Sequence, residues 1–340
     1  MSGLSIVDHA GAAPVISLPR DYNAAVDLIE RNLGAGRGDR IAYIDDHGRY
    51  PFKALSERVD RAANALRGLG LGLEDRIMVA LLDTIDFPVV FLGAIKAGIV
   101  PVAANTLLKP ADYTFMLNDS RAKALVVSDA LLPMFADAIQ ASPHLRHVIV
   151  SGAHGAASGL GLAALMDAAA PTAMAAPTTR DDPCFWLYSS GSTGTPKGTV
   201  HIQSSPIHTA ELYARPVLGL TEHDVVFSAA KLFFAYGLGN ALSFPLAVGA
   251  TTILMAERPT PEAVFKRLIE HRPTVFYGVP TLYAGMLAHP SLPARDQVSI
   301  RVCTSAGEAL PADVGRRFSA HYGVDVLDGI GSTEMLHIFL

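Results

Sequence analysis

Short apolar runs alternate with longer amphipathic segments along the first part of the chain. The runs are rich in Val, Ile and Leu and predict buried β-strands, at residues 76–82, 99–104, 124–127 and 147–151. Helical spacing of apolar residues predicts helices at residues 22–33, 52–68, 86–98, 111–119 and 131–141. This alternation is typical of a mostly parallel sheet covered by helices. Residues 1–152 are therefore predicted to form one α/β half.

The same alternation returns after a connection rich in Ala, Gly and Pro, at residues 153–180. Further strands are predicted at residues 185–188, 225–228, 252–255, 274–277, 301–304 and 325–328. Residues 181–340 are therefore predicted to form a second α/β half. The fold class expected from the pattern is α/β.

One stretch, from Leu232 to Ala256, has no charged residue and is long enough to span a bilayer. It is interrupted by Gly237, Gly239, Pro245 and Gly249. We therefore expect a buried helix, a turn and a strand here, and no membrane partner.

The amino-acid composition further narrows the class of protein and its expected partners. Of the 340 residues, 50% are apolar and 17% charged, which allows a substantial buried core, and the net charge of −5 argues against a nucleic-acid partner. Cys184 and Cys303 are too few for a disulfide framework and lack the spacing of metal ligands, so a reducing, cytoplasmic location is expected. The N-terminus has no basic segment followed by an apolar one, so no secretory leader is predicted.

The segment WLYSSGSTGTPKGTVH, residues 186–201, concentrates Gly, hydroxyl side chains and one lysine directly after a predicted strand. Glycines allow the backbone to approach a ligand closely, and successive N–H groups can bind an anion. The Walker pattern fails, because the fifth residue after Gly191 is Pro196 where a glycine is required. A flexible linker is disfavoured by Pro196, Lys197 and the strand-like run that follows them. The segment therefore indicates a phosphate loop of another kind.

The SSGSTGTPKG core of this segment resembles the phosphate-binding signature of the acyl-adenylate-forming enzymes, which include acyl-CoA synthetases, adenylation domains and firefly luciferase. Two further motifs occur in that family's order: TSAGEAL at 304–310 resembles the adenine-side loop, and DGIGSTE at 328–334 resembles the Gly-x-Thr-Glu segment. The resemblance covers essentially the whole chain and implies the large N-terminal domain of that fold, with two stacked, predominantly parallel sheets and flanking helices. The sequence stops where the family's core domain continues, so a C-terminal truncation without the mobile C-terminal domain is expected.

The resemblance also implies a reaction: ATP, Mg²⁺ and a carboxylic acid give an acyl-AMP and pyrophosphate, and the acyl group then passes to a thiol such as CoA. Two anions meet in the first step, so the site must neutralise charge, which a metal ion and oriented hydrogen-bond donors can do.

The family's motifs assign roles to individual residues. The leaving phosphates would be held by Ser189, Ser190, Gly191, Ser192, Thr193 and Gly194, with Lys197 beside them. Ser305, Ala306, Gly307 and Glu308 would lie along the adenine and ribose, and Asp328 and Gly329 along the other edge of the adenine. Thr333 would contact the α-phosphate and Glu334 would bind Mg²⁺, which makes these two the candidate catalytic residues. For Glu308 and Glu334 a capping role stays open, and Lys197 can equally be a solvated loop lysine.

Two segments of the sequence indicate which kind of carboxylic acid the protein binds. The first segment is KLFFAYGLGN, residues 231–240, which has Lys231 and Phe234 at positions where many relatives have Pro and His. Together with the second segment, GIGSTEMLHIF, it resembles the corresponding segments of benzoate-CoA ligases and their hydroxybenzoate relatives. The aryl pocket is expected to be lined by Phe234, Ala235, Tyr236, Gly237, Gly329, Ile330 and His337. Ile330 also replaces the aromatic residue that stacks on adenine in many relatives. His337 is expected to hydrogen-bond a ring hydroxyl or water, the alternative being a core histidine on an apolar strand.

The function expected from the sequence is that of an ATP-dependent aryl-acid:CoA ligase of benzoate or hydroxybenzoate type. Two alternatives stay open: an adenylation enzyme that loads an aryl acid onto a carrier protein, and a truncated fragment that binds ligand without activity. The chain by itself is expected to be poorly active or inactive. The expected partners are a small aromatic carboxylic acid, ATP and CoA, and a homodimer is neither required nor excluded.

Overall fold

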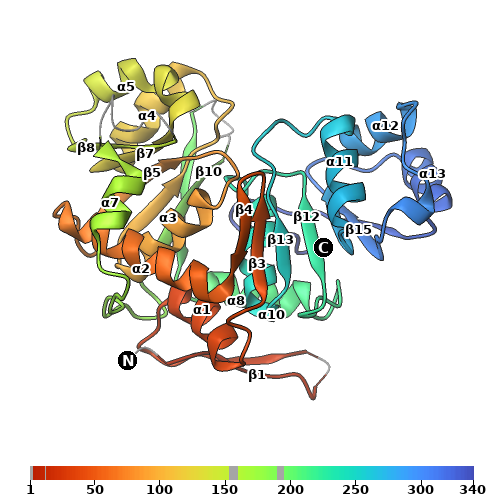
Figure 1. Ribbon diagram of the computed structural model, residues 1–340, viewed down its shortest axis with the longest axis horizontal. Coiled ribbons are helices and arrows are strands. Elements are labelled where there is room, and N and C mark those ends of the chain that lie inside the picture. Colours follow the sequence, from red (N-terminus) through yellow and green to blue (C-terminus); the bar gives the residue numbers. More distant parts are fainter. Residues whose placement is uncertain (1–2, 12, 153–159, 190–194) are drawn as a thin grey trace.

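The computed structural model describes residues 3–11, 13–152, 160–189 and 195–340. Within these residues the chain forms two seven-stranded sheets and a small two-stranded one. Figure 1 shows the two large sheets side by side, with helices between them and on both outer faces. The prediction of two stacked, predominantly parallel sheets with flanking helices is confirmed.

The first sheet has the strand order β11-β10-β6-β5-β7-β8-β9. Its strands are β5 (Arg76–Ala80), β6 (Val100–Ala103), β7 (Ala124–Ser128), β8 (His147–Ser151), β9 (Leu160–Gly161), β10 (Pro183–Ser189) and β11 (Lys197–Ile202). Neighbouring strands are parallel except β10 and β11, which form an antiparallel hairpin.

The second sheet has the order β16-β15-β14-β12-β13-β3-β4. Its strands are β3 (Ile41–Asp45), β4 (Gly48–Pro51), β12 (Val225–Ser228), β13 (Thr251–Ile253), β14 (Val275–Gly278), β15 (Val302–Ser305) and β16 (Val326–Asp328). Here the edge strand β4 is antiparallel to β3 and the other pairs are parallel.

The helices fill three layers around these sheets. Between the sheets lie α1 (Ala24–Gly34), α2 (Phe52–Gly68), α3 (Asp86–Lys96), α8 (Ser205–Thr209) and α10 (Phe244–Val248). The outer face of the first sheet carries α4 (Pro110–Ser120), η1 (Asp129–Phe135) and α5 (Ala136–Ala141), and that of the second carries α11 (Pro261–His271), α12 (Pro280–Ala288) and α13 (Ala312–Tyr322). The remaining elements are α7 (Leu162–Ala168), η2 (Ala210–Ala214), α9 (Ala235–Leu238), η3 (Gly239–Ser243) and η4 (Arg295–Gln297).

The alternation of strand side chains builds this layered core. On β5, Ile77 and Val79 face the core between the sheets, whereas Met78 faces the outer helices. On β14, Phe276 likewise packs outward against the helices of the second sheet, and its neighbour Val275 packs inward. Apolar side chains on both faces explain why these strands appear in the sequence as continuous apolar runs.

The sheets do not follow the two predicted halves. The hairpin β10–β11 was predicted in the second half but joins the first sheet, where Trp186 pairs with Val102 of β6. The hairpin β3–β4, for which no strand was predicted, joins the second sheet at β13. The division of residues 1–152 and 181–340 into domains therefore stays a prediction, but it is not the division between the sheets.

Two other local predictions can be compared with the structure. The helix predicted at 131–141 is broken, because Pro133 lies in a 3₁₀ segment, η1, that precedes the short helix α5. The uncharged stretch 232–256 is a series of short helical turns followed by β13, as expected, and Gly249 ends α10 in the left-handed conformation. Among the described residues no helix is both long and apolar enough to cross a bilayer.

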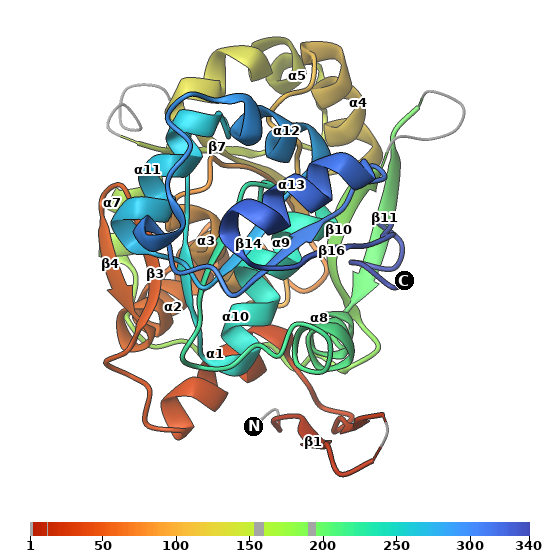
Figure 2. The ribbon, with the colours of Figure 1, turned by 90° about the vertical axis from the view of Figure 1, so that its right-hand side faces the viewer.

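The two-stranded sheet is an N-terminal hairpin of β1 (Ile6–Asp8) and β2 (Val15–Ser17). Figure 2 shows it below the body of the molecule, away from the two large sheets.

Candidate active site

A cavity of about 680 Å³ opens where the two sheets meet. Its walls are loops that follow the carboxyl ends of parallel strands: residues 82–83 after β5, 106–107 after β6, 229–236 after β12, 306–307 after β15 and 331–333 after β16. Open α/β sheets bind ligands outside the carboxyl ends of their strands. The volume is that of a small-molecule site, so this cavity is the candidate active site.

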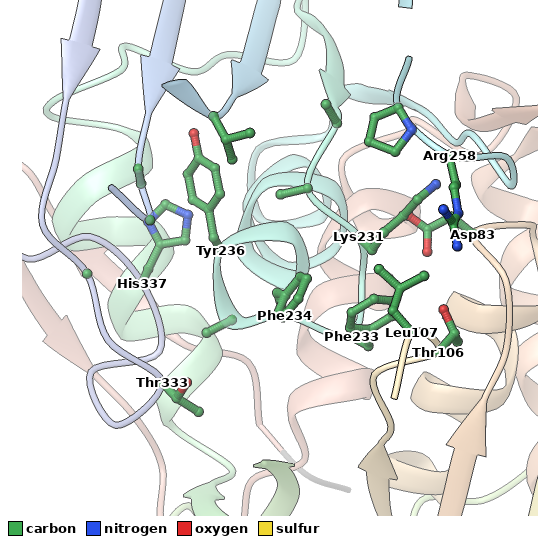
Figure 3. Close-up of a pocket in the computed structure, with 18 of the residues that line it drawn as sticks. Asp83, Thr106, Leu107, Lys231, Phe233, Phe234, Tyr236, Arg258, Thr333 and His337 are labelled. Atoms are coloured by element: carbon green, nitrogen blue, oxygen red, sulfur yellow. The ribbon is translucent and has the colours of Figure 1, made fainter. Parts of the chain in front are cut away.

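One end of the cavity is aromatic (Figure 3). Four residues predicted for the aryl pocket line it, Phe234, Ala235, Tyr236 and His337, and Phe234 is 44% exposed. The Tyr236 hydroxyl lies 2.5 Å from Thr304 Oγ1 and donates to the Gly278 carbonyl at 3.3 Å. Burial raises the pKa of Tyr236, so its phenol stays neutral. These contacts hold the Tyr236 ring beside that of His337.

His337 is buried and also lines the cavity, so its role towards an acid stays a prediction. Only 2% of its surface is exposed, and its ring packs among Tyr213, Tyr236 and Phe244. It does not lie on a strand, because Leu336 before it has a φ of 66°. Nε2 lies 2.9 Å from Asn240 Oδ1. Burial lowers the pKa of His337 to about 3, so the ring is neutral at ordinary pH.

Three residues predicted for the aryl pocket lie near it but outside its lining. Gly237 lies in the first turn of α9, where a Cβ would meet the Lys231 carbonyl oxygen at 2.0 Å. A Cβ on Gly329 would lie 2.6 Å from Ile338 Cγ2, and Ile330 is 61% exposed. Gly237 therefore allows α9 to pack closely against the loop after β12, and Gly329 leaves room for the side chain of Ile338. Contact of the three predicted residues with an acid stays a prediction.

Another part of the cavity wall, next to His337, is formed by Gly, Ser and Thr residues. Of the predicted nucleotide residues, Ala306, Gly307 and Thr333 line it, together with Gly331 and Ser332. Ser305 is fully buried at the end of β15, and its carbonyl accepts the Gly329 N–H at 2.9 Å. Glu308 is exposed outside the lining. The carboxylate of Asp328 accepts the Leu310 N–H at 3.1 Å, so it ties the loop after β15 to that after β16.

The predicted phosphate loop is only partly described. Ser190, Gly191, Ser192, Thr193 and Gly194 lie outside the described residues. Ser189 ends β10 and pairs with Lys197, the first residue of β11, and neither residue lines the cavity. The two strands that flank the loop in sequence are therefore paired at the edge of the first sheet, and the role of the loop stays a prediction.

His201 on β11 joins the hairpin to the turn that carries Thr333, and the sequence analysis did not identify it. Its Nε2 lies 2.9 Å from the Thr333 carbonyl. Burial lowers the pKa of His201, although the hydrogen bond to Thr333 and the nearby Glu334 oppose this. Glu334 itself is exposed next to Thr333, and in the part of the chain that is described no group of three or more His, Cys, Asp or Glu side chains could hold a metal.

Lys231 and Asp83, two charged residues on the side of the cavity away from His337, also escaped prediction as site residues (Figure 3). Lys231 donates from Nζ to the carbonyls of Met255 and Glu257, the latter at 2.6 Å, and its burial lowers its pKa. Asp83 accepts the Leu232 N–H, 3.3 Å from each carboxylate oxygen. This bond links the loop after β5 to the loop after β12, and hence one sheet to the other. The sequence marks Lys231 because many relatives have Pro at this position, whereas no motif or pattern in the sequence marks Asp83.

Asp83 provides a prediction about stability. Burial raises its pKa from 3.8 to about 6, so folding favours the protonated carboxyl. The resulting stabilisation is fully present below about pH 4 and is lost as the pH rises to about 6. A shift of this size corresponds to about 3 kcal/mol. Urea unfolding of the wild type and Asp83→Asn should therefore show a stability difference that changes by about this amount between pH 4 and pH 7, in favour of the variant at the higher pH. A difference that does not vary with pH would contradict the prediction.

The sequence matches the AMP-binding enzyme family over residues 30–340. It is 62% identical to a benzoate–CoA ligase of Thauera aromatica, over 100% of this chain and 64% of that protein. It is 48% identical to a 4-hydroxybenzoate–CoA/benzoate–CoA ligase of Rhodopseudomonas palustris, over 94% of this chain and 59% of that protein. A solved benzoate CoA ligase from Burkholderia xenovorans LB400 is similar in structure, with a TM-score of 0.88 at 58% identity, over 94% of this chain and 63% of that one.

The chain thus spans less than two thirds of the length of these relatives. The match from residue 30 to residue 340, together with the two-sheet fold and the cavity at the strand ends, shows that the chain belongs to the AMP-binding enzyme family.

Proposed function

We propose that this chain carries the acid-binding and nucleotide-binding parts of an ATP-dependent aryl-acid:CoA ligase of benzoate or hydroxybenzoate type. In the first step the acid's carboxylate attacks the α-phosphorus of ATP, a new O–P bond forms, and the bond to the bridging oxygen breaks to release pyrophosphate. In the second step the CoA thiol attacks the carbonyl of the aryl-AMP, a C–S bond forms, the acyl C–O bond breaks to release AMP, and the thiol proton passes to solvent. The ligase names of the similar proteins support this reaction.

The observation that carries the proposal is a cavity whose wall combines two chemically different groups of residues. Ala235, Tyr236 and His337 offer a slot with one small and two flat walls, which suits an aromatic ring. Ala306, Gly307 and Thr333 line the cavity as well, and their small side chains leave backbone groups and a hydroxyl accessible to a nucleotide. A ring in the slot has room to direct its carboxylate towards an α-phosphate near Thr333.

The remaining nucleotide roles follow from the neighbouring loops. Ser305, Ala306, Gly307 and Glu308 would follow the adenine and ribose, with Asp328 and Gly329 along the other edge of the adenine. Ser189 and Lys197 flank the loop whose other members, Ser190–Gly194, would grip the departing pyrophosphate. The hydrogen bond between His201 and the Thr333 carbonyl supports this arrangement, because it anchors the Thr333 turn to the hairpin that carries the loop.

The residues present fit a Mg²⁺ ion held mainly by phosphate oxygens. Mg²⁺ in nucleotide sites typically keeps only one or two protein carboxylates as ligands, and Glu334 provides one beside Thr333. When bound there, the ion would neutralise charge on the phosphates. This chain's own contribution is to hold the ion through Glu334 and to orient the α-phosphate through Thr333. A cytoplasmic location and a homodimer stay predictions.

The test is ATP–pyrophosphate exchange by the protein in its full-length form, with benzoate, its hydroxy and amino derivatives and medium-chain fatty acids. We expect exchange with aryl acids, AMP release when free CoA is added, and little exchange by the 340-residue chain alone. Preference for a fatty acid over every aryl acid would overturn the aryl assignment. AMP release that requires a carrier protein in place of CoA would favour the adenylation alternative. Exchange by the 340-residue chain at a rate typical of such enzymes would contradict the expected low activity.

A further inference from the structure

One buried hydrogen bond joins strand β11 to the turn that carries Thr333. Nε2 of His201 lies 2.9 Å from the Thr333 carbonyl oxygen, and His201 is only 4% exposed. The imidazole lies opposite Phe185 on β10, with 5.0 Å between the ring centroids. Within the described residues, no other hydrogen bond connects β10 or β11 with residues 329–340. The position of this turn relative to the hairpin therefore depends on His201.

The chemistry of the two groups fixes the direction of the bond. A backbone carbonyl only accepts, so Nε2 of His201 carries a proton and donates it to Thr333. Burial lowers the pKa of His201, so the ring is neutral at neutral pH and this is its single N–H. The ring therefore acts as a fixed donor and has no acidic proton to spare for a substrate.

The turn keeps its own shape without His201. The Thr333 carbonyl also accepts the Leu336 N–H at 3.1 Å, and the Ser332 hydroxyl oxygen accepts the Met335 N–H at 3.2 Å. Leu336 has a left-handed φ of 66° and is 3% exposed, so its burial holds a conformation that a residue with a Cβ adopts reluctantly. These contacts lie within the turn or behind it. Loss of the His201 bond would therefore shift the turn relative to β11 and leave its fold intact.

The two elements that the bond joins hold different parts of ATP under the proposed function. Strand β11 begins at Lys197, beside the phosphate loop, and side chains two apart on a strand share a face, so Lys197 and His201 lie on the same face of β11. Thr333 lines the cavity and is the proposed contact of the α-phosphate. The phosphates of ATP are covalently joined, so both elements can bind them at once only at one separation. AMP, which lacks the outer phosphates, makes no such demand.

We propose that His201 is a positioning residue for aryl-AMP formation, whose Nε2–H sets the separation between β11 and the Thr333 turn so that the triphosphate of ATP fits both. This inference rests on the proposed function, because it requires the α-phosphate at Thr333 and the leaving pyrophosphate at the hairpin. It assigns His201 to the first step alone. In the second step pyrophosphate has left, and the aryl-AMP no longer bridges the two elements.

Two amide variants isolate the donor. The amide nitrogen of glutamine reaches about the place of a histidine Nε2, whereas that of asparagine reaches only about the place of Nδ1. His201→Gln therefore keeps the bond to Thr333, and His201→Asn loses it at similar polarity. In single-turnover measurements on the full-length protein with benzoate, His201→Asn should form aryl-AMP about tenfold more slowly than the wild type, since one hydrogen bond is lost. His201→Gln should retain most of the rate.

Two further measurements distinguish positioning from general damage. Conversion of purified benzoyl-AMP and CoA into benzoyl-CoA should proceed within about twofold of the wild-type rate in both variants. Calorimetry without acid should show ATP binding about fivefold more weakly to His201→Asn, with the affinity for AMP unchanged. A merely structural role of His201 would weaken both nucleotides and slow both steps.

The outcomes separate this inference from the proposed function. If the wild type forms no aryl-AMP with any aryl acid, the proposed function fails and this inference fails with it. If the wild type reacts but His201→Asn slows neither step or slows both equally, the inference is overturned while the proposed function stands. His201→Gln as slow as His201→Asn would also overturn it. Circular dichroism shows whether each variant is folded, and His201→Leu, which lacks the donor and suits a buried site, gives the same comparison if His201→Asn is not.

Discussion

Gly237→Ala is expected to destabilise the protein by about 3 kcal/mol or more. The added Cβ would lie 2.0 Å from the Lys231 carbonyl oxygen and 2.6 Å from that of Ala230. Both contacts are with backbone atoms, which cannot rotate away as the end of a flexible side chain can. Relief would require the first turn of α9 to move away from the loop after β12, and that turn carries Ala235 and Tyr236 into the cavity.

Urea unfolding of the 340-residue chain measures this effect, and Gly285→Ala is the matched control. Gly285 also lies in a helix, α12, but a Cβ there would meet only Pro261 Cγ at the ordinary distance of 3.5 Å. Because Ala favours a helix by about 1 kcal/mol over Gly, the control should be neutral or slightly stabilised. Equal stabilities of the two variants would show that α9 does not need this close approach.

The sequence predicted most strands and helices because their signal is local. Parallel strands that are buried on both faces appear as runs of Val, Ile and Leu, such as residues 76–82 and 124–127. The hairpin Ile41–Pro51 had no such run, since polar residues at its turn and edge interrupt the apolar ones. Sheet membership could not be predicted either, because the pairing of Trp186 with Val102 joins residues far apart in the sequence and leaves no periodic trace.

The candidate site was predictable to the extent that motifs marked it. Tyr236, Ala306, Thr333 and His337 come from three separate segments, and the structure brings all of them to one cavity. The residues that escaped prediction, such as His201 and Asn240, are single buried polar groups whose partners are distant in the sequence. A lone polar residue in an apolar segment carries no information about its partner, so only the fold reveals its role.

Thr333→Val is expected to slow aryl-AMP formation about a hundredfold in the full-length protein, with the affinity for the aryl acid unchanged. Under the proposed function the Thr333 hydroxyl donates to the α-phosphate, where negative charge develops during attack, and loss of one such donor typically costs a factor of this size. Valine keeps the shape of the side chain, and the turn stays anchored because His201 contacts the Thr333 carbonyl, not its side chain.

Thr333→Ser, which keeps the hydroxyl, should retain most of the rate. Single-turnover measurements with the three proteins isolate this step. A Val variant as fast as the Ser variant would exclude the hydroxyl from the reaction and leave the shape of the turn as the contribution of Thr333.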